Sequence, residues 1–178
     1  AIHHFLDRKG LILGICNGFQ GLIQSGLLPY GRVCKPDENA PILYYNEIGR
    51  HVTQMVRTQV IEDQSPWLRG MKGKTFWMPI SHGEGRLLLN NNTLQELIQN
   101  QQIATQYVDL QNNIAVERPW NPNGSTQAIE GITSPCGQIY GRMGHPERVE
   151  EGTFINIPQV EIMNIFRNAV TFVQELKM

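Results

Sequence analysis

The sequence lacks a surplus of charge of either sign. Its 178 residues contain 15 lysines and arginines against 16 aspartates and glutamates, for a formal net charge of −1. Charged residues make up only 17% of the chain, below the ~25% that is usual for soluble domains. Uncharged amides, 14 Asn and 15 Gln, supply much of the polar character instead. This composition lacks the broad basic surface with which proteins bind nucleic acids, so we expect no nucleic-acid partner.

Long apolar runs are also missing, and cysteine is scarce. No apolar run approaches the ~18 residues that indicate a membrane-spanning helix. Residues 1–10 do not show the basic end and apolar stretch of a signal peptide. Three cysteines are a small and odd number, which is typical of free thiols in a reducing compartment. These features predict a cytoplasmic protein that does not contact a membrane.

Length and hydrophobic content predict one globular domain over residues 1–178. This length lies within the ~100–200 residues of a typical domain, and a hydrophobic fraction of 40% argues against disorder. A chain of this size buries roughly 70% of the surface that its unfolded form exposes, so its core needs no metal or disulfide. No internal repeat and no long linker divides the chain.

The hydrophobic pattern predicts an α/β fold. Residues 11–15 form a short continuous apolar run, as in a strand that is buried on both faces of a parallel sheet. Residues 19–28 follow directly with helical spacing. Further strands are expected at 52–61, 75–80, 103–110, 128–132 and 138–142, and further helices at 93–100, capped by Thr93, and from Pro158 onward. The expected architecture is an open, mostly parallel sheet with helices on both faces.

The first residues resemble the end of a helix. Residues 2–9 have helical apolar spacing and stop at Gly10. Because the tail of a helix is an unusual place for a domain to begin, we expect that one or more N-terminal strands of this domain lie outside the chain.

Cys16 is a candidate nucleophile because it lies where the first predicted strand ends and a helix begins, between Gly14 and Gly18. Such an elbow presents a side chain at the carboxyl end of the sheet, where open α/β sheets bind ligands. A helix N-terminus lowers the pKa of a thiol and offers N–H groups to an anion. The alternative is a buried cysteine that packs as a small hydrophobic residue, which is our interpretation of Cys34 and Cys136.

A thiol nucleophile needs a base with an orienting group. Two of the five histidines have a glutamate two residues further on: His82 with Glu84, and His145 with Glu147. On an extended backbone either glutamate points to the same side as its histidine, although either pair could also be a solvated pair at a strand end. Pro146 restrains His145 to extended backbone angles, so spacing alone favours the second pair.

Several stretches resemble the class I glutamine amidotransferases. GICNGFQ at residues 14–20 resembles their nucleophile motif, and GHPE at 144–147 resembles their C-terminal histidine–glutamate motif. A finer resemblance is to the glutaminase domains of phosphoribosylformylglycinamidine synthases. It rests on these two stretches with LLP at 27–29, HGEGR at 82–86, NPNGS at 121–125, IEGI at 129–132 and GRMGHPER at 141–148. Each motif is weak alone, whereas the ordered set spans most of the chain.

The resemblance implies a flavodoxin-like glutaminase fold and a Cys-His-Glu triad. Cys16 would attack the side-chain amide of glutamine to give a thioester and ammonia, His145 would carry the proton, and Glu147 would orient His145. We expect the His145 ring within about 4 Å of the Cys16 sulfur. The backbone N–H of Asn17 would be an oxyanion donor. The glutamine pocket would be lined by Gln20, Ser81, His82, Gly83 and Glu84, with His82 as a wall and not the base.

The resemblance further implies a synthase domain or subunit as partner. That partner would use ATP and magnesium to amidate formylglycinamide ribonucleotide in purine biosynthesis with the ammonia. No G-x-x-x-x-G-K phosphate loop and no zinc-type cysteine–histidine spacing occurs here, so we expect no metal and no cofactor in this domain.

Two alternatives stay open at this point. In the family, a second oxyanion donor comes from a glycine-rich loop in the first part of the domain, which these 178 residues do not contain. The chain could therefore be a catalytically incomplete docking fragment. It could also be another class I amidotransferase or a thiol hydrolase on the same fold.

Overall fold

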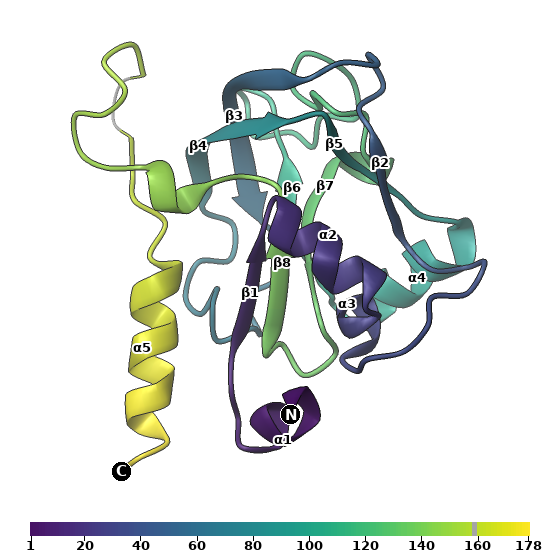
Figure 1. The fold of residues 1–178 in the computed structure, drawn as a ribbon. Coiled ribbons are helices and arrows are strands. Elements are labelled where there is room, and N and C mark those ends of the chain that lie inside the picture. Colours follow the sequence, from purple (N-terminus) through teal and green to yellow (C-terminus); the bar gives the residue numbers. More distant parts are fainter. Residues whose placement is uncertain (158–159) are drawn as a thin grey trace.

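Six strands form the main sheet of this α/β fold (Figure 1). The computed structural model describes residues 1–157 and 160–178. In spatial order the strands are β1 (Ile12–Ile15), β8 (Ile139–Arg142), β7 (Ile129–Thr133), β6 (Ile103–Tyr107), β3 (Val52–Val60) and β4 (Thr75–His82). The sheet curls strongly, so that β3 and β4 cross the direction of β1 and β8 in Figure 1.

The prediction of a mostly parallel sheet is wrong. Only β1 and β8 pair in parallel, and the other four pairings of the main sheet are antiparallel. A parallel pair needs a crossover of a dozen or more residues, whereas residues 134–138 join β7 to β8 in a short turn. Strands β6, β7 and β8 are buried at every position, a pattern that parallel sheets usually show. Here the same burial occurs in strands whose pairing is antiparallel, so burial did not indicate the strand direction.

A second sheet, which the sequence pattern did not predict, pairs β2 (Ile42–Tyr45) with β5 (Glu84–Leu88) in antiparallel fashion. Strand β4 runs on to His82 and β5 begins at Glu84, so the expected turn at residues 81–84 is a sharp change of direction between two strands. The small sheet stands beside α2 in Figure 1.

Five α-helices accompany the strands in the described residues: α1 (Ile2–Asp7), α2 (Asn17–Gln24), α3 (Leu27–Tyr30), α4 (Asn91–Gln99) and α5 (Ile165–Glu175). Short 3₁₀ turns form at η1 (Thr126–Ala128) and η2 (Pro146–Arg148). None of these helices has the length and hydrophobicity that a membrane crossing requires.

Three helix boundaries differ from the prediction. The helix expected at residues 19–28 is divided into α2 and α3 at Gly26, whose φ is 77°. The cap of α4 is Asn90 and not Thr93, because the Asn90 side chain accepts the Thr93 N–H at 2.8 Å. The predicted start of the last helix, Pro158, lies outside the described residues, and α5 begins at Ile165.

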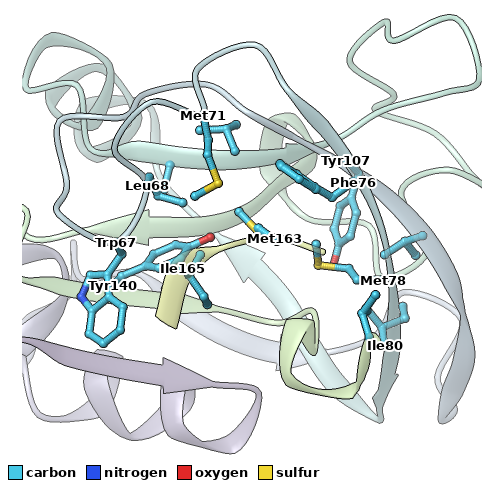
Figure 2. Close-up of a cluster of buried hydrophobic side chains, with 14 of the residues drawn as sticks. Trp67, Leu68, Met71, Phe76, Met78, Ile80, Tyr107, Tyr140, Met163 and Ile165 are labelled. Atoms are coloured by element: carbon cyan, nitrogen blue, oxygen red, sulfur yellow. The ribbon is translucent and has the colours of Figure 1, made fainter. Parts of the chain in front are cut away.

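Two buried clusters lie on opposite faces of β1. Ile12 packs with the apolar residues of α2, α3 and α4, whereas Leu13 packs with a cluster that includes Ile165 of α5. Figure 2 shows this second cluster, in which side chains from β4, β6 and β8 converge with Met163 and Ile165. Burial of apolar surface on both sides, at about 25 cal/mol per Å², holds the ends of β1, β8 and β4 in fixed positions.

Candidate active site

Cys16 joins β1 directly to α2 with an unusual backbone conformation. Its φ is 53° and its ψ is −109°. For a residue with a Cβ, this conformation costs of order 1–3 kcal/mol, and such strained residues cluster at functional sites. The Cys16 N–H donates to the Arg142 carbonyl at 2.8 Å, and the Cys16 carbonyl accepts the Gln20 N–H at 3.2 Å. The elbow that the sequence predicts is therefore present and is held on both sides.

Gly14 permits the close contact between β1 and α2 at this elbow. A Cβ on Gly14 would lie 2.7 Å from the Gly18 carbonyl oxygen and 2.5 Å from Leu22 Cδ1. Atoms cannot approach that closely without displacement, so the absence of a side chain at Gly14 sets the distance between strand and helix.

The Cys16 thiol is half-buried, and its sulfur lies 3.9 Å from the Ser81 carbonyl oxygen. Burial raises the pKa of this thiol. The Asn17 N–H and the Arg148 guanidinium lower the pKa, and the Glu147 carboxylate raises it further. The sequence predicts that the helix N-terminus lowers this pKa; the N–H does so, but burial outweighs it. The resting thiol is thus protonated and requires a base.

His145 has the orienting hydrogen bond that such a base needs. Its Nδ1 lies 2.6 Å from Glu147 Oε1. Because a carboxylate accepts and does not donate, Nδ1 carries the hydrogen and Nε2 keeps a free lone pair. That Nε2 is buried and has no partner within the described part of the chain. His145 is therefore in the tautomer that can accept a proton at Nε2.

The end of β4 contacts both Cys16 and His145. The Ser81 carbonyl faces the Cys16 sulfur, and the Pro79 carbonyl accepts the His145 N–H at 2.9 Å. Carbonyls two residues apart on a strand point the same way. Since Ile15 of β1 is also paired in parallel with Arg142 of β8, both predicted catalytic residues leave the sheet at the same edge.

The other histidine–glutamate pair is not formed. His82 Nδ1 lies 3.1 Å from Asn46 Oδ1, while Glu84 is exposed and its backbone carbonyl accepts the Gln20 Nε2 hydrogen bond at 2.9 Å. The Gly83 carbonyl accepts the Asn46 N–H at 2.9 Å. Glu84 thus does not orient His82, and the choice of His145 as the base stays a prediction.

A pocket of about 460 Å³ lies beside α2, within the ~300–1,000 Å³ range of small-molecule sites. Three predicted residues line it: Asn17, Gln20 and Glu84. Ile42 and Leu43 of β2 also line it, and we did not expect these because β2 was not predicted. Ser81, His82 and Gly83 lie outside this pocket; the Ser81 hydroxyl is instead 3.0 Å from His51 Nε2.

A buried ion pair links the two halves of the site, and sequence reasoning missed it. Glu130 and Arg142 have fully buried side chains, with Arg142 Nη2 3.1 Å from Glu130 Oε2. Glu130 Oε1 accepts the Gly144 N–H at 2.6 Å, directly before His145, while the Arg142 carbonyl accepts the Cys16 N–H. The sequence did contain a signal for this pair, because Glu130 lies within an otherwise apolar predicted strand. A charged residue is almost never buried without a partner of opposite charge.

The other two cysteines and the metal-ligating side chains provide no further candidate for a functional site. Cys34 is half-buried and Cys136 is exposed, so the prediction of burial fails for Cys136. Within residues 1–157 and 160–178, no group of three or more His, Cys, Asp or Glu side chains is arranged to hold a metal ion.

The chain matches a known protein family over most of its length. The profile of the CobB/CobQ-like glutamine amidotransferase domain matches residues 1–173. The chain belongs to this family. The amidotransferase domain is 40% identical over 148 residues to phosphoribosylformylglycinamidine synthase subunit PurQ of Picrophilus torridus, covering 83% of this chain and 56% of that protein. It is 36% identical over 152 residues to the subunit of the same name from Koribacter versatilis, covering 85% and 60%.

Solved structures show the same fold. A chain of the PurLQS structure from Thermotoga maritima superposes with a TM-score of 0.69 at 28% identity, over 97% of this chain and 66% of that one. A putative GMP synthase subunit from Thermoplasma acidophilum shares the fold alone, with a TM-score of 0.51 at 14% identity, over 99% and 65%. The amidotransferase domain thus spans less than two thirds of the length of these relatives.

Proposed function

We propose that this domain hydrolyses glutamine and supplies the ammonia for a phosphoribosylformylglycinamidine synthase in purine biosynthesis. The family match and the PurQ relatives support this function. The main structural support is the strained elbow at Cys16. The Cys16 sulfur contacts the Ser81 carbonyl at the end of β4, and the Pro79 carbonyl on the same strand accepts the His145 N–H.

The proposed first half-reaction forms a thioester. His145 Nε2 takes the proton of the Cys16 thiol, and the sulfur attacks the amide carbon of glutamine. The amide oxygen becomes an oxyanion next to the Asn17 N–H, the same group that lowers the pKa of the Cys16 thiol. His145 then gives its proton to the departing nitrogen, which leaves as ammonia. The proposal requires the His145 ring within about 4 Å of the sulfur.

In the second half-reaction water hydrolyses the thioester, with His145 as base, and releases glutamate. Glu147 stabilises the imidazolium that forms in both halves through its 2.6 Å contact with Nδ1. The high thiol pKa fits this cycle, because the proton stays on sulfur until a substrate is present.

Gln20, Glu84 and the pocket beside α2 would hold the amino-acid end of glutamine. This assignment is supported by the 2.9 Å hydrogen bond that orders Gln20 against the Glu84 carbonyl. Ser81 would form the adjoining wall, since its carbonyl faces the sulfur, and Gly83 would support it through Asn46.

The synthase partner would bind ATP and magnesium, and this domain would use no cofactor of its own. The likeness to synthase subunits named PurQ and to a chain of the Thermotoga maritima PurLQS structure supports a synthase partner. The three free thiols fit a cytoplasmic location.

The decisive experiment substitutes Cys16 in the complete enzyme, with its synthase partner. Cys16→Ala should lower glutamine-dependent synthesis by ~10⁴-fold or more and leave synthesis from added ammonia unchanged. Cys34→Ala and Cys136→Ala serve as matched controls and should affect neither activity. Normal glutamine use by Cys16→Ala would exclude the function. Loss of ammonia-dependent synthesis as well would point to the docking role.

A further inference from the structure

His82 is a buried histidine with an unused nitrogen. The residue is only 4% exposed, and its Nε2 has no hydrogen-bond partner within residues 1–157 and 160–178. A buried polar atom without a partner costs about 1–3 kcal/mol, and a native structure keeps one mainly where a ligand or water completes it. The Cys16–His145–Glu147 mechanism does not use this atom.

The hydrogen bonds of Asn46 define the tautomer of His82. Asn46 Nδ2 donates to the Arg50 carbonyl at 3.0 Å and to the His82 carbonyl at 2.8 Å. Both amide hydrogens are thereby used, so the Asn46 Oδ1 at 3.1 Å from His82 Nδ1 is an acceptor. His82 therefore carries its hydrogen on Nδ1, and its Nε2 presents a lone pair.

His82 also stays uncharged. Burial, together with the positive charges that His51 and His145 can carry, lowers its pKa to about 4. At neutral pH the ring is thus a neutral acceptor.

The ring is held in one position. A Cβ on Gly85 would lie 2.4 Å from His82 Cε1, so the imidazole occupies the space that a side chain at residue 85 would fill. Asn46 is itself fixed through its N–H to the Gly83 carbonyl at 2.9 Å. The lone pair therefore has a fixed direction, as a binding group requires.

We propose that His82 Nε2 accepts a hydrogen bond from the nitrogen that leaves glutamine, first as the amide –NH₂ and then as ammonia. This inference rests on the proposed glutaminase function. A bare lone pair cannot bind the carboxylate or the oxyanion, so the ligand group must be an N–H or O–H donor.

Two observations favour the reacting end of glutamine over its α-ammonium group. Ser81, the preceding residue, directs its carbonyl at the Cys16 sulfur, and the charge of His145 acts on His82. By contrast, His82 does not line the pocket of Gln20 and Glu84, where the amino-acid end is proposed to lie. His82 would thus contact the substrate directly and orient the departing nitrogen toward His145.

The test compares an amide and an ester in the complete enzyme. Glutamine and glutamate γ-methyl ester share the carbonyl and the α-ammonium group, but the ester has no N–H on its leaving group. His82→Asn keeps a group that can reach Asn46 but removes the acceptor at the Nε2 position. Its kcat on glutamine should fall about 10- to 100-fold, while its kcat on the ester stays within about threefold of the wild type.

His82→Gln is the matched rescue, because the side-chain oxygen of glutamine reaches the position of Nε2. It should restore the wild-type ratio of amide to ester turnover to within about threefold. Equal losses on both substrates for His82→Asn, or no loss on glutamine, would overturn the inference. A wild-type enzyme that uses ammonia but hydrolyses neither substrate would instead contradict the proposed function.

Discussion

The backbone N–H of Cys16 donates to the carbonyl oxygen of Arg142 at 2.8 Å, and the side chain of the same arginine pairs with Glu130 inside the sheet. Glu130 in turn accepts the N–H of Gly144, the residue before His145. One buried ion pair thus connects the segment that carries the candidate nucleophile with the segment that carries the candidate base. Its partners are fully buried, so water cannot replace either one.

Removal of Glu130 should therefore damage both stability and catalysis. We expect Glu130→Ala to lower the free energy of unfolding by about 3–5 kcal/mol, because the Arg142 charge would remain buried without its partner. Glu130→Gln can still accept the Gly144 N–H and should cost less. Urea unfolding of the purified chain measures the stabilities of the wild type, Glu130→Gln and Glu130→Ala, which should decrease in that order. Equal stability of the wild type and Glu130→Ala would contradict this prediction.

The packing of α2 on β1 predicts opposite effects for two glycines. Gly14→Ala places a Cβ 2.5 Å from Leu22 Cδ1 and should destabilise the chain by about 1–3 kcal/mol. A Cβ on Gly21, within α2, would meet no other part of the described chain within 4 Å. Gly21→Ala should therefore stabilise the helix by about 0.5–1 kcal/mol. Thermal unfolding separates the two variants, and a destabilised Gly21→Ala would count against this account.

The elbow could be predicted from sequence because each of its parts is local. An apolar run ending at Ile15, a cysteine between glycines and the helical spacing after it are all contained in residues 11–28. The observed β1 and α2 meet at Cys16 as expected. The His145–Glu147 pair could also be predicted from the sequence, because its two members are only two residues apart.

Strand direction and the buried polar contacts could not be predicted in this way. Continuous burial is the same in a parallel sheet and in a curled antiparallel one, as β6 and β7 show. The contact of His82 with Asn46 joins residues 36 positions apart, and one sequence contains no signal for that partner. Residues 42–45 show no alternation of apolar and polar side chains, so β2 had no recognisable strand pattern.

The charges near the Cys16 thiol predict two opposite changes in its pKa. The Arg148 guanidinium lowers this pKa and the Glu147 carboxylate raises it. Arg148→Gln should therefore raise the thiol pKa, and Glu147→Gln should lower it. The rate of alkylation by iodoacetamide, measured against pH, reports the thiolate directly.

Glu147→Gln should also lose about 10²-fold or more in glutamine hydrolysis, so its thiol becomes easier to ionise as its activity falls. A pKa that moves the same way in both variants would refute this.

The backbone of Cys16 predicts that its side chain lowers the stability of the fold. Its φ of 53° and ψ of −109° are close to the first central position of a type II′ turn, where glycine is favoured. Cys16→Gly removes the Cβ that makes this conformation unfavourable, whereas Cys16→Ala retains it. Both variants lack the thiol and should be inactive with glutamine. We expect Cys16→Gly to be about 1 kcal/mol more stable than Cys16→Ala, despite the greater flexibility of glycine in the unfolded chain. Urea unfolding at equal ionic strength compares them, and a less stable Cys16→Gly would show that the elbow carries no strain.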